Sequence, residues 1–347
     1  MLKKLGKIIF ISVVSISGFS INSQACTRVI CEGADRYITT RSLDWEENIP
    51  SALWIFPKGL KRNGGGDNPL FWTSKYGSVI TSGYDSFTGD GMNEKGLVAN
   101  MLWLSESDYR KSNNPTLSIG ALAQYVLDNY SNVKQAVQGL KSLKFQIITT
   151  KLPGDSEDAN MHLVISDSSG DSAIFEFIKG KMKVHHSKKY KVATNSPTYN
   201  KQLAIDSYWK GVGGKAMLPG THRPADRFVK ASFYTNNITK GKMYDDKKMA
   251  ISRAFSIIRD ASVPIGIDIP HEKKDLPSTI WRSISDQKEL RYYLDVVVSP
   301  SVFWVDIKKL NLSKKGEVKK LDLSNYPNYS GEVSDMFIKA KPFKWLD

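Results

Sequence analysis

The sequence contains very little cysteine: Cys26 and Cys31 are the only two in 347 residues. Two thiols cannot form a disulfide framework of the kind that staples small secreted domains. If both lie on one extended strand, five residues apart, they point to opposite faces and are too distant to bridge. No His or Cys pair has the spacing of metal ligands. We therefore expect no metal and no other cofactor.

Several other features are missing. No apolar run after residue 25 is long enough to span a bilayer, so no stable membrane insertion of the rest of the chain is expected. There is no internal repeat and no low-complexity linker. The formal net charge is +14, but the basic residues are scattered and do not form a stripe interleaved with aromatics. This pattern is typical of a solvated surface and speaks against a nucleic-acid partner.

What the chain does contain is a secretory signal pattern at its start. Residues 3–7 include three lysines, residues 8–19 are apolar, and Ser23 and Ala25 are small residues at the positions a signal peptidase inspects. We predict that residues 1–25 are removed on export and that residues 26–347 form one mature domain, periplasmic or extracellular. A lipoprotein signal also ends before cysteine, but it prefers an aliphatic residue where this chain has Ser23.

Cleavage after Ala25 would make Cys26 the N-terminal residue, with a thiol and a primary amine side by side. An unperturbed α-amine has a pKa of about 7.7–8.0 and an unperturbed thiol one of about 8.5, so the amine can serve as base for its own thiol. The competing interpretation is an accidental cysteine after an ordinary cleavage site. The signal alone does not separate the two.

A histidine base for Cys26 is not evident. The five histidines, at positions 162, 185, 186, 222 and 271, lack a catalytic context, and the pair at 185–186 falls in a predicted lysine-rich turn. Arg41 and Asp44, three residues apart, offer a cation for a thiolate and a carboxylate for an amine, provided their strand pairs with that of Cys26. By itself such a pair is more often a surface ion pair.

The order of predicted elements favours one layered α+β domain over βαβ repeats. Runs of β-branched and aromatic residues predict strands at 27–31, 37–41, 52–56, 77–82, 96–104, 145–149, 162–166, 172–178, 191–194, 279–284, 291–298 and 302–307. Helical periodicity predicts helices at 117–130, 133–143, from near 225, and at 248–259. Residues 61–67 are predicted to be a flexible turn and residues 260–277 a loop.

Seven short motifs then occur in the order in which one known family carries them. They are CTR at 26–28, RSLDW at 41–45, GMNEKGL at 91–97, TNSPTY at 194–199, LPG at 218–220, DRFVKASF at 226–233 and SVPIG at 262–266. In this the chain resembles the choloylglycine hydrolase family of N-terminal-nucleophile amidases. The family includes bile salt hydrolases, penicillin V acylases and N-acyl homoserine lactone acylases. The resemblance implies a four-layer αββα sandwich, no cofactor, and a homo-oligomer, often a tetramer.

The resemblance also implies roles for individual residues. Cys26 would be the nucleophile and, through its α-amine, the general base, with Arg41 beside the thiolate and Asp44 hydrogen-bonded to the amine. Asn195 would donate its side-chain N–H to the oxyanion, a contact worth about 2.7–4 kcal/mol in the transition state. Arg227 would complete the polar network. Without the family context, Asn195 is interpreted as a turn residue and Arg227 as an exposed helix charge.

One position departs from the bile salt hydrolase pattern. Where those enzymes have asparagine in a Gly-Leu-Asn-Phe stretch, this chain has Trp103, which leaves only a backbone N–H for the oxyanion. Trp45, directly after Asp44, is a second indole near the same site. A tryptophan in a strand is ordinarily a core residue, but two beside catalytic motifs indicate an aromatic acyl pocket. The pattern resembles the Gram-negative penicillin V and homoserine lactone acylase branch.

The sequence therefore predicts an exported amidase that cleaves small linear N-acyl amides such as penicillin V or N-acyl homoserine lactones. The closest alternative is a bile salt hydrolase with the same chemistry and a wider pocket. A non-catalytic periplasmic binding protein on the same fold is the alternative from another class. A eukaryotic acid amidase has only the sequon at Asn237 in its favour.

Overall fold

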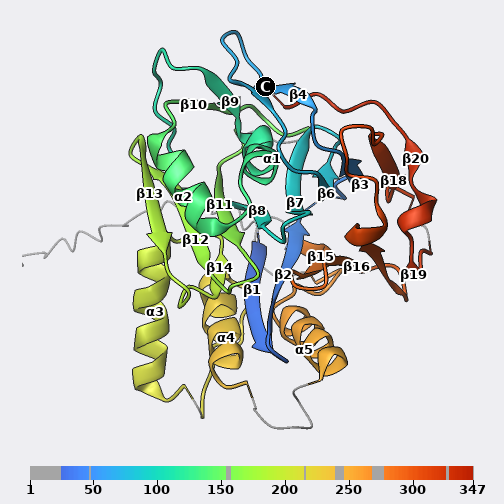
Figure 1. Ribbon diagram of the computed structural model, residues 1–347. Coiled ribbons are helices and arrows are strands. Elements are labelled where there is room, and N and C mark those ends of the chain that lie inside the picture. The colour runs from blue at the N-terminus through green and yellow to red at the C-terminus, as the bar shows by residue number, and fades with distance from the viewer. Residues whose placement is uncertain are drawn as a thin grey trace, which may run out of the picture.

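Two large sheets pack face to face and carry helices on their outer surfaces (Figure 1). The computed structural model describes residues 25–46, 48–153, 158–214, 216–238, 246–267, 277–325 and 328–346. The predicted signal segment up to residue 24 and His271 lie outside the described residues. Within them, no helix has the length and apolar character needed to cross a bilayer. The layer order is αββα, which confirms the predicted α+β sandwich.

The first sheet contains the strand whose second residue is the predicted nucleophile, Cys26. Its order is β14 (Val192–Thr194), β1 (Ala25–Gly33), β2 (Arg36–Trp45), β15 (Ser278–Asp286), β16 (Arg291–Val296), β17 (Val302–Asp306) and β19 (Gly331–Glu332). Its outer face is covered by α4 (Pro224–Asn236) and α5 (Lys247–Asp260), and α3 (Tyr199–Val212) packs beside α4. The 3-10 turns η1 (Ile307–Lys309) and η2 (Ser334–Met336) follow β17 and β19. β1 thus lies inside the sheet, between two hydrogen-bonded neighbours.

The second sheet faces the first across the core. Its order is β13 (Lys181–His186), β12 (Ser172–Ile178), β11 (Met161–Ser166), β8 (Val98–Trp103), β7 (Phe87–Asn93), β6 (Ser78–Gly83), β3 (Ser51–Phe56), β18 (Lys319–Asp322) and β20 (Ile338–Lys339). Helices α1 (Ile119–Asn129) and α2 (Val133–Ser142) cover its outer face. Two small ribbons, β4 (Lys61–Asn63) with β5 (Phe71–Thr73) and β9 (Thr116–Ser118) with β10 (Gln146–Ile148), complete the fold.

The structure differs from the sequence-based expectation at several places, and the short strands β5, β9, β18, β19 and β20 were not predicted. The predicted turn at 61–67 begins with strand β4, and the predicted turn at 185–186 is the end of strand β13, where His185 bonds to Glu176. Helix α3 was not predicted because its buried residues, Tyr199, Gln202 and Asp206, include two polar ones and form no apolar stripe. Strand β7 was not predicted either, because its sequence contains two glycines and resembles that of a turn. A Cβ on Gly91 would lie 2.5 Å from the Ile80 side chain, so close strand packing requires glycine there.

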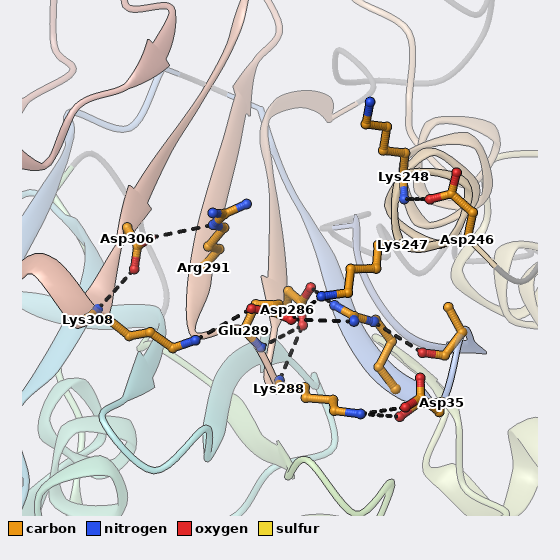
Figure 2. Close-up of polar contacts among 12 residues, drawn as sticks. Asp35, Asp246, Lys247, Lys248, Asp286, Lys288, Glu289, Arg291, Asp306 and Lys308 are labelled. Atoms are coloured by element: carbon orange, nitrogen blue, oxygen red, sulfur yellow. Dashed lines mark hydrogen bonds and ion pairs between the residues drawn. The ribbon is translucent and has the colours of Figure 1, made fainter.

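Ion pairs hold the end of the first sheet that lies away from Cys26 (Figure 2). Glu289, in the turn between β15 and β16, lies 2.9 Å from Lys247 of α5 and 3.5 Å from Lys308 of η1. The hydrogen bond and charge of Lys247 lower the pKa of Glu289 to about 2. Arg36, at the start of β2, forms a buried ion pair with Asp286 at 2.7 Å. These contacts join β2, β15 and α5 into one unit.

Candidate active site

Cys26 is the second residue of β1 and is only 2% exposed. Side chains alternate along a strand, so Cys26 and Arg28 share one face and Thr27 the other. Arg28 donates to Ser172 of the second sheet at 2.7 Å, whereas Thr27 accepts a hydrogen bond from Arg227 of α4. The thiol of Cys26 therefore points between the two sheets. Cys31, at the far end of β1, is also a free buried thiol, and burial raises its pKa to about 12.

Arg41 brings a fixed positive charge to the sulfur. It lies on β2, whose antiparallel pairing with β1 sets Cys26 opposite Leu43. Its Nη2 is 3.6 Å from Cys26 Sγ and donates to the Met101 carbonyl of β8 at 2.8 Å. The guanidinium also stacks on Trp281, 5.0 Å from the ring centroid. A rigid, buried cation in this position attracts negative charge that develops on the sulfur during a reaction.

Asp44 and Arg227 form a buried pair on the other face of the first sheet, with 3.5 Å between Asp44 Oδ2 and Arg227 Nη1. Asp44 also accepts hydrogen bonds from Thr279 Oγ1 at 2.6 Å and Ser42 Oγ at 3.1 Å. Burial raises the pKa of Asp44 above its ordinary value, and the charge of Arg227 opposes that shift. Among the described contacts, Asp44 makes none with the Cys26 nitrogen. Its predicted bond to a free α-amine stays a prediction for the processed chain.

Asn195 lies beside Cys26 although 169 residues separate the two. Its Oδ1 accepts the N–H of Cys26, which is a peptide nitrogen while Ala25 is attached, and also faces Arg227 Nη2 at 3.4 Å. Two donors on one oxygen fix which end of the amide is nitrogen. The remaining Nδ2 is buried and has no hydrogen-bond partner among the described residues. An unused buried donor beside a nucleophile is what an oxyanion site requires.

The two tryptophans are in contact. The rings of Trp45 and Trp103 meet edge to face, with 5.7 Å between centroids and 73° between planes. Both indoles are largely buried. The Leu104 N–H bonds to Asn160 on the β11 side, so the Trp103 N–H, one residue earlier, points away from β11. The Met101 carbonyl that holds Arg41 points the same way. That the two indoles bind an acyl group stays a prediction.

Sequence reasoning missed Asp90, a fully buried carboxylate on β7. It accepts hydrogen bonds from Asn100 at 2.6 Å, Ser283 at 2.9 Å and Tyr292 at 2.7 Å. Burial raises the pKa of Asp90, and the positive charge of Arg41 opposes that shift. Asp90 is therefore part of the electrostatic environment of Arg41. Its position just before the GMNEKGL motif was the one available signal.

The described histidines do not supply a base. None of His162, His185, His186 and His222 makes a hydrogen bond to Cys26 in the part of the chain that the structure describes. His162 is buried without a partner for either ring nitrogen, and burial lowers its pKa to about 4. Within the same residues, no group of three His, Cys, Asp or Glu side chains is arranged to hold a metal ion.

The αββα sandwich, with a buried cysteine near the start of an inner strand, is the fold of the N-terminal-nucleophile hydrolases. The model of one family, "Linear amide C-N hydrolases, choloylglycine hydrolase family", matches residues 26–326. The chain belongs to this family and is an amidase of linear amides. The match begins at Cys26.

Individual relatives agree. The chain is 48% identical to a penicillin V acylase of Pectobacterium atrosepticum, with 96% of each chain covered. It is 25% identical to a bile salt hydrolase/transferase of Clostridium perfringens, over 83% of this chain and 94% of that one. Among solved structures, penicillin V acylase from Agrobacterium tumefaciens superposes with a TM-score of 0.85 at 48% identity, covering 92% of this chain and 99% of that one. The conjugated bile acid hydrolase of Clostridium perfringens shares the fold, with a TM-score of 0.71 at 22% identity, covering 88% and 98%.

Proposed function

We propose that the mature protein hydrolyses penicillin V and related small N-acyl amides, with Cys26 as nucleophile. The observation that carries the proposal is the arrangement around the sulfur. Arg41 lies 3.6 Å from Sγ, and the unpaired Nδ2 of Asn195 belongs to an amide whose oxygen holds the Cys26 nitrogen. The 48% identity to two penicillin V acylases supports this choice of substrate.

The geometry supports a two-step reaction. Cys26 Sγ attacks the amide carbon, and the α-amine freed by processing takes the thiol proton. The oxyanion is stabilised by Asn195 Nδ2–H and by the backbone N–H of Trp103. The α-amine, held by Asp44, then passes the proton to the leaving nitrogen, giving a thioester and a free amine. Water, deprotonated by the same α-amine, attacks the thioester, which releases the carboxylic acid and restores the thiol.

The pair Trp45 and Trp103 favours a flat aromatic acyl group such as the phenoxyacetyl group of penicillin V. N-acyl homoserine lactones are the second candidate, because their acyl chains are apolar and their amines small. The deciding assay compares kcat/KM for penicillin V, a long-chain N-acyl homoserine lactone and a conjugated bile salt. We expect the bile salt to be the poorest of the three. A bile salt preference would make the protein a bile salt hydrolase, and inactivity on all three would favour a binding protein.

We also propose that residues 1–25 are an export signal and that the mature enzyme works in the periplasm. The family match from residue 26 supports this boundary. N-terminal sequencing of protein from a periplasmic extract tests it: the expected first residue is Cys26. A mature chain that begins elsewhere leaves the thiol residue without an α-amine and contradicts the mechanism.

A homo-oligomer, by resemblance a tetramer, is proposed as the working form. Large apolar side chains are exposed on and after α3: Tyr208 at 65% and Met217 at 54%. Their neighbours in sequence, Trp209 and Ala216, line a pocket of about 430 Å³ between α3 and α4. Light scattering on Met217→Lys should report a smaller species than the wild type, whereas Ile338→Lys, at an exposed apolar side chain on β20, should not. A monomeric wild type contradicts the proposal.

A further inference from the structure

Two distant segments meet at the predicted oxyanion site. Trp103 ends β8, and Asn195 directly follows β14, so both lie just where their strands stop pairing. The two strands belong to different sheets. Backbone pairing within a sheet therefore cannot fix the separation between the Trp103 N–H and the Asn195 amide. Something between the sheets must set it.

A chain of hydrogen bonds spans this gap. The Trp103 indole N–H donates to Ser105 Oγ at 3.3 Å, and the Ser105 backbone N–H donates to Ser196 Oγ at 3.1 Å. The Ser196 hydroxyl in turn donates to Glu106 Oε2 at 2.7 Å. We call Ser105, Glu106 and Ser196 the Ser196 bridge. Ser196 directly follows Asn195, and Ser105 and Glu106 lie two and three residues after Trp103, so the bridge links the segments that carry the two candidate oxyanion donors.

A second set of contacts holds the turn from the other direction. Gln202 of α3 donates to the carbonyls of Asn195 and Pro197, and the Tyr199 N–H donates to Glu176 at 2.6 Å. These contacts fix the turn relative to α3 and β12. None of these contacts reaches the residues that follow β8. The hydroxyl of Ser196, in contrast, contacts both Ser105 and Glu106.

We propose that Ser196 and Glu106 are positioning residues that set the distance between Asn195 and Trp103 across the oxyanion. The inference rests on the proposed function, because it assumes that both groups stabilise the same oxygen. The Ser196 hydroxyl donates to a carboxylate, and a hydrogen bond from a hydroxyl to a carboxylate is stronger than one between neutral groups. Displacing a catalytic donor by about 1 Å costs up to about 10²-fold in rate.

The test is a pair of substitutions at Ser196. Ser196→Ala removes the bridge, and we expect kcat for penicillin V to fall roughly tenfold with little change in KM, as for other groups that orient a reacting residue. Ser196→Thr keeps the hydroxyl and should retain most of the activity. Ser324→Ala is the matched control, because Ser324 Oγ also donates to a carboxylate, that of the exposed residue Asp322 at the end of β18, and makes no described contact with the bridge.

Two inhibitors separate positioning from general damage. Phenoxyacetaldehyde adds to the Cys26 thiol, forming an S–C bond and placing its oxygen at the oxyanion position, while the thiol proton is transferred to the hemithioacetal. The product acid phenoxyacetate forms no S–C bond and no tetrahedral adduct, although its carboxylate can accept hydrogen bonds from the same donors. Ser196→Ala should weaken aldehyde inhibition by the same factor as kcat/KM and should weaken phenoxyacetate inhibition clearly less. Equal weakening of both ligands would overturn the positioning role.

Glu106 gives an independent check. Glu106→Gln keeps an acceptor oxygen and should retain activity better than Glu106→Ala. Glu106→Ala leaves the contact between Ser105 and Ser196 and should lose no more activity than Ser196→Ala, which removes both contacts. The double variant should be no worse than Ser196→Ala, because that substitution already breaks the whole bridge. Wild-type kcat in Ser196→Ala, or multiplicative losses in the double variant, would overturn the inference. A wild type that cleaves none of the three amides in the panel would instead overturn the proposed function, and this inference with it.

Discussion

Replacing Cys26 with serine is expected to lower kcat for penicillin V by at least about 10³-fold, because a neutral hydroxyl is a far weaker nucleophile than a thiolate. The sulfur is buried against Arg41 at 3.6 Å, and serine is close enough in size for the fold to persist. The measurement is kcat on purified protein whose N-terminus at residue 26 has been established by mass spectrometry. That check separates a loss of chemistry from a failure of processing.

Cys31→Ala is the control for this experiment. Cys31 is the only other thiol in the chain, lies on the same strand, and is held neutral by burial, which raises its pKa to about 12. We expect Cys31→Ala to retain kcat. In this variant, reaction with a thiol reagent should be lost only at position 31. If Cys26→Ser keeps wild-type activity, or Cys31→Ala loses it, the assignment of the nucleophile is wrong.

Replacing Asn195 with aspartate is expected to lower kcat by about 10²–10³-fold, the usual cost of losing one oxyanion donor. Aspartate is nearly isosteric and keeps an oxygen to accept the N–H of Cys26 and the contact with Arg227. It removes the unpaired Nδ2 donor and adds a negative charge where the oxyanion forms. The loss should therefore appear in kcat, with KM for penicillin V nearly unchanged.

Asn195→Ala provides the comparison, because it removes both ends of the amide. If the oxygen only positions the Cys26 nitrogen, alanine should be much worse than aspartate. If the nitrogen stabilises the oxyanion, the two variants should lose comparable activity. Asn311→Ala, at an exposed loop position, should behave as the wild type. An aspartate variant with wild-type kcat would exclude Asn195 as an oxyanion donor.

Much of the fold was predictable because its inner strands and amphipathic helices carry strong local patterns. The strand predicted at 37–41 lies in the first half of β2, and the helix predicted at 248–259 is α5 almost to its ends. The failures have a common cause. Helix α3 buries Gln202 and Asp206, and β7 is buried despite two glycines, so in both cases tertiary contacts override the local signal.

The candidate site likewise has residues that could be predicted from the sequence and relations between residues that could not. The sequence could nominate Cys26 from its place after a signal pattern, and the motif order could nominate Arg41, Asp44, Asn195 and Arg227. No local pattern could reveal that Asp90 lies in the environment of Arg41, or that Ser196 reaches Glu106. Those relations depend on which strands of the two sheets face one another.

The sequence by itself therefore determined the residues available: one thiol directly after a predicted signal segment, an arginine and an aspartate three residues apart, and two tryptophans. The sequence could determine this because the chemistry of a side chain depends on its residue type, and because each motif consists of residues that are close in sequence. Only the tertiary structure decided the arrangement. The alternation of β1 turns Cys26 toward the second sheet and Thr27 toward Arg227. Strand pairing brings Asn195 to Cys26, 169 positions away, because Asn195 directly follows β14, which is hydrogen-bonded to β1 within the first sheet.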